Sequence, residues 1–178
     1  NLYMDDILDM IDWASDISVD TPKKTTINAN IPTTRQVIEF TDRYMKDTAR
    51  FTGYDASEGA LYVLFMLTLA MHPMGPSIFS VDSFDHALNP RLAKKMIQVF
   101  CEQIIQNNKH VFLTTHNPLV LDGLDLQNDD IRLFAVDRDS NGYAQIRRIS
   151  VSQELIDEGL PLSRLWISGR LGGVPSLL

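Results

Sequence analysis

Two short apolar runs with a helix-like stretch between them limit the folds open to this chain. The runs are residues 78–82 and 111–115. Between them, Asn89-Pro90 is a typical helix start, and Asn107-Asn108 a typical stop. The apolar residues in between recur at helical spacing: Leu92, Met96, Ile97, Phe100 and Ile104. A strand, a helix and a second strand with short connections predict an α/β fold with a parallel sheet flanked by helices.

The residues before this unit predict helices, a strand and loops. Apolar residues at helical spacing predict an amphipathic helix over residues 2–14. Residues 15–34 are rich in Thr, Asn, Asp and Pro, which predicts a loop. A strand is expected over 35–42, then a loop to Asp55, and then a helix over 60–71 that is buried on most sides. We expect residues 1–34 to be a helix and linker that end a preceding insertion or lobe, and residues 35–178 to form the main domain.

The last part of the chain predicts a β-hairpin. Residues 131–138 and 143–149 alternate in polarity around Asp139-Ser140-Asn141-Gly142, in which Asn-Gly would supply positive φ values. We expect this terminal hairpin at the edge of the parallel sheet. A short helix is expected over residues 153–159, followed by a turn-rich end.

Three polar segments stand where ends of strands or helices would present them. Asp82 closes the first predicted strand, where P-loop NTPases hold Mg²⁺, although an isolated match is more often an ordinary acid. His116 follows the second strand, 116 − 82 = 34 residues later, and Ser57 lies 82 − 57 = 25 residues before Asp82. Ser57-Glu58-Gly59 opens the buried helix, where it forms either a simple N-cap or an anion site.

In this order, the three segments resemble the carboxyl-terminal half of ABC-type ATPase heads of the SMC/RecF-like kind, often called the AAA_21 family. The resemblance covers about residues 35 to 175. It makes Ser57-Glu58-Gly59 the signature, Asp82 the Walker B acid and Thr114–Pro118 the switch loop. It implies a P-loop NTPase fold with ATP and Mg²⁺ as ligands. The chain has no Gly-x-x-x-x-Gly-Lys-Ser/Thr motif (Walker A), so we expect an amino-terminal Walker A lobe in a longer parent protein.

The resemblance also implies a role for each matching residue. Asp82 would bind Mg²⁺, and His116 would contact the γ-phosphate or the attacking water. Ser57-Glu58-Gly59 would contact a nucleotide held by a second head, and Ala87-Leu88-Asn89 would be the D-loop that crosses between the heads. These roles imply an ATP-dependent, head-to-head homodimer that acts in DNA repair or anti-phage defence. A nucleic acid or an effector protein would be a further partner of the parent, with no membrane involved.

One position departs from the family pattern. The Walker B acid is usually followed by a glutamate that polarises water, and this chain has Ser83 there. A serine hydroxyl has no basicity at neutral pH and cannot replace a carboxylate as general base. Hydrolysis is therefore expected to be slow, or to depend on His116 and Asp85. Nucleotide-driven dimerisation would survive this change.

Two alternatives to an active ATPase remain at this stage. One is a non-catalytic, ABC-like interaction or scaffold module that keeps the fold without turnover. The other is a Toprim-like metal nuclease, in which Asp137 and Asp139 would join Asp82 in a metal site. Against the nuclease, two acids beside an Asn-Gly turn are more often solvated surface groups.

Composition restricts the setting and the partners. The chain has 178 residues, enough for one domain with a real core. Its net charge of −7 argues against a broad nucleic-acid-binding surface on this chain. The single cysteine, Cys101, cannot form an internal disulfide, which favours a reducing, cytoplasmic setting.

Overall fold

The structure is a computed structural model that describes residues 2–21, 36–45, 50–150, 152 and 158–171. The chain divides into two compact units, residues 1–75 and 76–178. The boundary that the sequence predicts between residues 34 and 35 stays a prediction.

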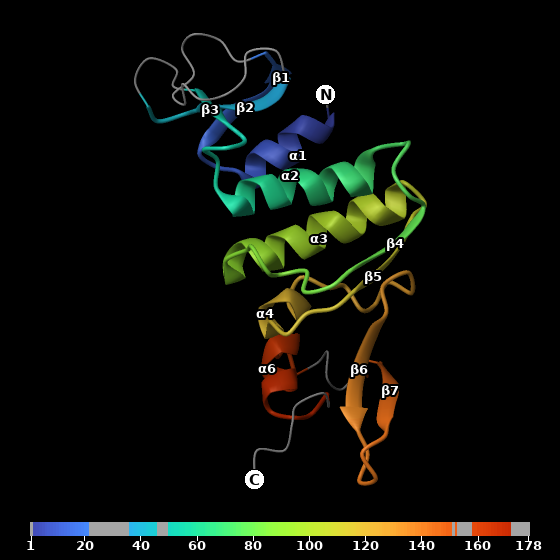
Figure 1. Cartoon of the computed structure of the whole chain (residues 1–178). Helices are drawn as coiled ribbons and strands as arrows, with labels where there is room; N and C mark the ends of the chain where they lie inside the picture. Colours follow the sequence, from blue (N-terminus) through green and yellow to red (C-terminus); the bar gives the residue numbers. More distant parts are fainter. Residues whose placement is uncertain (1, 22–35, 46–49, 151, 153–157, 172–178) are drawn as a thin grey trace. The chain divides into compact units, whose positions relative to one another are not determined.

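The first unit combines helices with an antiparallel sheet. Its elements are α1 (Leu2–Met10), β1 (Ala14–Asp20), β2 (Val37–Asp42), β3 (Arg50–Thr52) and α2 (Glu58–Met71), as Figure 1 shows. Among the described residues, β2 is the central strand, antiparallel to both β1 and β3. Aromatic rings fix the sheet to the turn after α1, since Trp13 lies 5.5 Å from Phe40 and 6.0 Å from Phe51, centroid to centroid.

Several predictions for this unit are wrong in detail. The helix expected over residues 2–14 ends at Met10, and Ala14 already belongs to β1. The loop expected over 15–34 begins with a strand instead, because residues 16–20 pair with β2 and tertiary pairing outweighs the low strand propensity of Asp and Ser. Residues 22–34 lie outside the described residues. The expected loop before Asp55 contains β3, which pairs with β2.

The helix α2 confirms the apolar helix predicted over residues 60–71. It is less completely buried than expected, because the Phe65 side chain is 57% exposed. Its buried residues are Ala60, Val63, Met66, Leu67, Ala70 and Met71.

The second unit contains the predicted strand, helix and strand. β4 (Ile78–Val81) pairs in parallel with β5 (His110–Leu113), and α3 (Pro90–Gln106) connects them. Asn89 caps α3 by accepting a hydrogen bond from the Leu92 N–H, and Asn108 follows the helix with a positive φ of 51°. Phe100 of α3 packs against Phe79 of β4, with ring centroids 6.3 Å apart. The α/β fold with a parallel sheet flanked by helices is therefore confirmed.

The rest of this unit consists of α4 (Pro118–Leu121), β6 (Leu133–Arg138), β7 (Ala144–Ile149) and α6 (Leu162–Ile167). β6 and β7 form the predicted hairpin, but the expected position at the edge of the parallel sheet is wrong. In the described part of the chain, they pair only with each other. Ala135 and Ile149 instead join a small core with Leu165 and Leu171.

The hairpin turn differs from the expected Asn-Gly turn, because Gly142 has a positive φ of 85° and Asn141 does not. The short helix predicted over 153–159 lies mostly outside the described residues. α6 was not predicted. Among the described residues, no helix is long and apolar enough to cross a membrane.

Candidate functional site

Asp82 and His116 lie at the same edge of the parallel sheet. Val81 ends β4 opposite Leu113, which ends β5, and the two strands run in the same direction. The segment after each strand therefore leaves the sheet at its carboxyl edge, where open parallel sheets bind ligands. Both side chains are exposed. This placement is the one that the sequence predicts for the two residues.

Thr114 ties the end of β5 to the segment after β4. Its hydroxyl donates a hydrogen bond to Oδ1 of Asp82 and accepts one from the Ser83 N–H, at 2.9 Å. Its backbone N–H donates to the Val81 carbonyl at 3.1 Å, and its carbonyl accepts from the Phe84 N–H at 2.9 Å. The Asp82 carboxylate is therefore oriented by a neighbouring hydroxyl.

Thr115 makes a second connection between the same two segments. Its hydroxyl donates to Oδ1 of Asp85 at 2.6 Å and accepts from the Asn117 N–H at 3.0 Å. Asn117 in turn caps α4 by accepting from the Leu119 N–H at 3.0 Å. The sequence alone assigned no role to the side chains of Thr114 and Thr115. Two hydroxyls directly before His116, facing acids three residues apart, are the signal that could have found them.

Ser83 adopts an unusual backbone conformation. Its φ is 54°, in the left-handed region that non-glycine residues seldom occupy. The turn places Phe84 inside the unit, where it is fully buried with its ring 5.5 Å from that of Phe100. This aromatic contact anchors the segment after Asp82 on α3.

The predicted D-loop residues follow directly. Leu88 is buried, and its N–H donates to the Asp85 carbonyl at 3.1 Å. Asn89 is exposed and uses its side-chain oxygen to cap α3, while Ala87 is half-buried. Their role in crossing between two heads stays a prediction.

The predicted signature residues lie in the first unit. Ser57 is the N-cap of α2, and its hydroxyl accepts from the Ala60 N–H at 3.3 Å. Ser57 and Glu58 are exposed, and Gly59 is half-buried. The N-cap interpretation is therefore confirmed, whereas the contact with a nucleotide of a second head stays a prediction.

Asp137 and Asp139, the acids of the nuclease alternative, belong to the hairpin. Asp139 accepts hydrogen bonds from the N–H groups of Tyr143 and Asn141, both at 2.9 Å. These bonds, that from Tyr143 above all, hold the pKa of Asp139 below its ordinary value. Asp139 thus stabilises a turn, as expected for an acid beside Asn-Gly.

The chemistry of the side chains bears on which metal site is feasible. In the described ranges, no group of three or more His, Cys, Asp or Glu side chains could hold a metal ion. Mg²⁺ in nucleotide sites uses one or two carboxylates together with phosphate oxygens and water. Asp82 is exposed, and its known hydrogen bond involves Oδ1. One exposed carboxylate such as that of Asp82 therefore fits Mg²⁺ that a nucleotide would help to hold.

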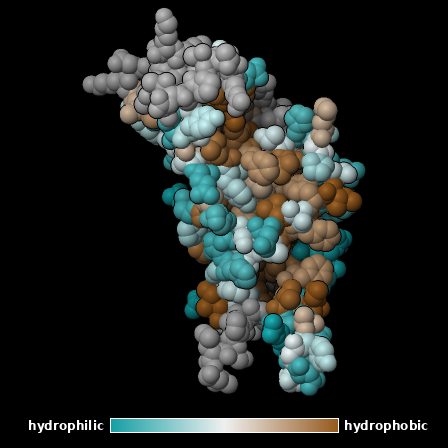
Figure 2. Space-filling view, in the orientation of Figure 1, coloured by the Kyte–Doolittle hydropathy of each residue, from teal (hydrophilic) through white to brown (hydrophobic). Residues whose placement is uncertain are grey.

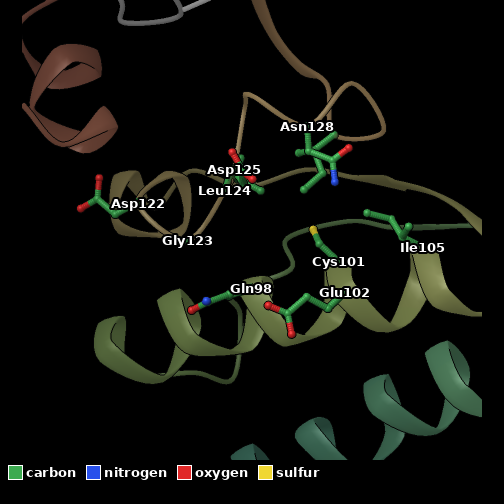
Figure 3. A pocket seen from close by; sticks show the side chains of 10 residues that line it. Gln98, Cys101, Glu102, Ile105, Asp122, Gly123, Leu124, Asp125 and Asn128 are labelled. Atoms are coloured by element: carbon green, nitrogen blue, oxygen red, sulfur yellow. The ribbon is translucent and has the colours of Figure 1, made fainter. Parts of the chain in front are cut away.

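A surface pocket of about 360 Å³ lies elsewhere in this unit, between α3 and the segment after α4. Figure 3 shows Gln98, Cys101 and Glu102 of α3 on one side and Gly123, Leu124 and Asp125 on the other. Burial raises the pKa of the Cys101 thiol to about 11, so little of the nucleophilic thiolate is present at neutral pH. None of the predicted nucleotide-binding residues lines the pocket. The strand-end edge therefore remains the candidate site, because the residues with phosphate and metal chemistry lie there.

Comparisons with known proteins agree with the resemblance. The family described as "AAA domain, putative AbiEii toxin, Type IV TA system" matches residues 11–122. No curated protein is similar enough in sequence to count as a relative.

The solved structures that are similar to this chain include two that contain parts of SMC proteins. One is described as "Structural biochemistry of ATP-driven dimerization and DNA stimulated activation of SMC ATPases"; it has 10% identity and a TM-score of 0.52, over 88% of this chain and 87% of that chain. The other is the Smc head domain with an extended coiled coil bound to the C-terminal domain of ScpA, from Pyrococcus furiosus. It has 12% identity and a TM-score of 0.49, over 94% of this chain and 36% of that chain.

The first structure supports the fold, and the family match spans more than half of the chain. The chain therefore belongs to this AAA domain family and is a P-loop ATPase-like module.

Proposed function

We propose that this chain is the carboxyl-terminal part of an SMC/RecF-like ATPase that binds ATP and Mg²⁺ between two heads and dimerises in response. In this proposal, Asp82 binds Mg²⁺ and His116 contacts the γ-phosphate. Ser57-Glu58-Gly59 and Ala87-Leu88-Asn89 act at the interface between the heads. A Walker A lobe of the same protein supplies the remaining phosphate contacts. The protein works in the cytoplasm, in DNA repair or anti-phage defence.

The observation that carries the proposal is the joint placement of Asp82 and His116. Their segments leave neighbouring parallel strands at one edge, and Thr114 hydrogen-bonds to Asp82 and Ser83 across the two strands. A carboxylate for the metal and an imidazole for the phosphate would then face one nucleotide, as the order of the motifs predicts. The name of the matching family and the description of the similar SMC structure favour the same assignment.

Ser83 favours a second candidate, the non-catalytic interaction module. Without a glutamate after Asp82, ATP would drive dimerisation with little turnover. The two candidates share nucleotide binding and differ in hydrolysis, so a rate measurement separates them.

The test is steady-state phosphate release by the full-length protein at saturating ATP and Mg²⁺. If the missing carboxylate limits hydrolysis, Ser83→Glu should raise the rate, because a placed general base contributes about 10²–10⁴-fold. Ser83→Gln is the matched control. Glutamine has the size of glutamate and would occupy the same left-handed backbone position, but its amide has no basicity. Equal rates for the two variants would contradict this explanation, and no hydrolysis in any of them would favour the non-catalytic module.

A further inference from the structure

The Thr115 hydroxyl, directly before His116, hydrogen-bonds to Asn117 directly after it and to Asp85 of the segment that follows β4. It donates to Asp85 at 2.6 Å and accepts from the Asn117 N–H at 3.0 Å. Asp85 and Thr115 are 30 residues apart in the chain, so this bond joins two separate segments. His116 is exposed between two residues that the hydroxyl holds in place.

Asp85 is connected in the same way to the predicted D-loop. Its carbonyl accepts from the Leu88 N–H at 3.1 Å, and Leu88 is buried. Asn89 then begins α3 as its N-cap. The main chain from Asp85 to α3 thus forms a hydrogen-bonded turn. The Asp85 carboxylate points to the segment that carries His116.

From this arrangement we infer that Thr115 and Asp85 are a pair of positioning residues that fix the His116 segment relative to Ala87-Leu88-Asn89. The functional meaning rests on the proposed function, in which the D-loop meets a second head and His116 meets the γ-phosphate. Formation of the interface would then set the position of His116 through this single hydrogen bond. Asp85 acts in this assignment by accepting a hydrogen bond, and it does not act as the general base that replaces the glutamate.

The two roles of Asp85 predict opposite results for a conservative change. Asp85→Asn keeps a carbonyl oxygen that can accept from Thr115 but removes the charge and the basicity. Asp85→Ala removes the acceptor as well. A positioning role therefore predicts that Asp85→Asn keeps the His116 segment fixed as in the wild type. Asp85→Ala should release this segment, as Thr115→Val should. A base would be lost in both Asp85 variants.

Amide hydrogen exchange of the full-length protein without nucleotide tests the link even if the proposed function fails. Thr115→Val and Asp85→Ala should each speed exchange at Leu88 by roughly tenfold, as expected for losing one hydrogen bond to a charged group. Thr115→Val also removes the acceptor of the Asn117 N–H, so it should speed exchange at Asn117 directly. Thr115→Ser and Asp85→Asn should stay close to the wild type. At Leu88, the double variant Thr115→Val/Asp85→Ala should exchange no faster than either single variant, because the two residues affect this amide through one shared interaction.

Thr68→Val is the matched control, since Thr68 donates its hydroxyl to the Leu64 carbonyl within α2, which belongs to the first unit. It should leave both amides unchanged. Additive effects in the double variant, or a Leu88 amide that does not respond to Thr115→Val, would overturn the inference. Where the wild type hydrolyses ATP, Thr115→Val should lower kcat more than it changes KM, and Thr115→Ser should restore kcat.

Discussion

Hydroxyl groups, more than ion pairs, hold the candidate site together at the scale of residues. Thr114 and Thr115 hydrogen-bond to Asp82 and Asp85, and each of the two threonines also accepts a backbone N–H. Hydrogen bonds to a charged group contribute about 1.5–3 kcal/mol each, more than a typical exposed ion pair. The geometry of the strand ends therefore depends on a few specific side chains.

Asp139 gives a prediction about pH at this scale. Because backbone N–H groups lower its pKa in the folded hairpin, the carboxylate stabilises the turn above its ordinary pKa of 3.8. This stabilisation should be lost as the pH falls below that value and through the lower pKa of the folded state. The measurement is the amide chemical shift of Asn141 and Tyr143 from about pH 6 to about pH 2. Asp139→Asn is the control, and an identical pH dependence in both proteins would contradict the assignment.

The sequence predicted part of the site at this scale. Asp82 and His116 were placed correctly, because a polar residue that ends an apolar strand is a local signal. The left-handed turn at Ser83 and the Thr115–Asp85 bond were not predicted. Both depend on how two segments about 30 residues apart meet, and no local pattern encodes that meeting.

At the scale of elements, close backbone packing fixes α4 between its neighbours. α4 contacts both α3 and α6. Asp122, at its end, accepts from the N–H and the hydroxyl of Ser163, both at 2.8 Å. Gly123 follows, and a Cβ there would lie 2.4 Å from the Lys94 carbonyl oxygen of α3. The position therefore tolerates only glycine without a shift of the main chain.

Gly123→Ala should destabilise the fold by about 1–3 kcal/mol, the usual cost of overpacking a well-packed site. Gly53→Ala is the matched control, because its Cβ would meet nothing closer than 3.6 Å. Thermal unfolding of the two variants and the wild type measures the difference. Equal unfolding temperatures for Gly123→Ala and Gly53→Ala would show that α3 and the segment after α4 do not approach so closely.

Elements that local interactions mark were predicted from the sequence, and elements that depend on long-range pairing were missed. β4, α3, β5 and the hairpin were predicted, because caps, turns and apolar periods mark them locally. β1 and β3 were missed, since their residues become strands only by pairing with β2. The separate sheet of the hairpin was missed for a similar reason: its inner face packs on α6, which was not predicted.

At the scale of the whole molecule, our proposal makes this chain one part of a nucleotide-dependent assembly. The chain carries an acid and a histidine at one sheet edge, and it contains no Walker A motif. Figure 2 shows one face of the protein, on which hydrophobic and hydrophilic side chains are mixed. In our proposal, the Walker A lobe and a second head complete the site around ATP.

The most direct test of this account is the molecular mass of the full-length protein in solution with and without ATP and Mg²⁺. We expect ATP to produce a dimer, and Ser57→Arg to prevent it while labelled ATP still binds, because Ser57 would act across the interface. Ser57→Ala is the control, because it also loses the N-cap, at a cost of about 0.5–2 kcal/mol, without adding bulk. A wild type that stays monomeric with ATP, or a Ser57→Arg variant that dimerises normally, would contradict the account.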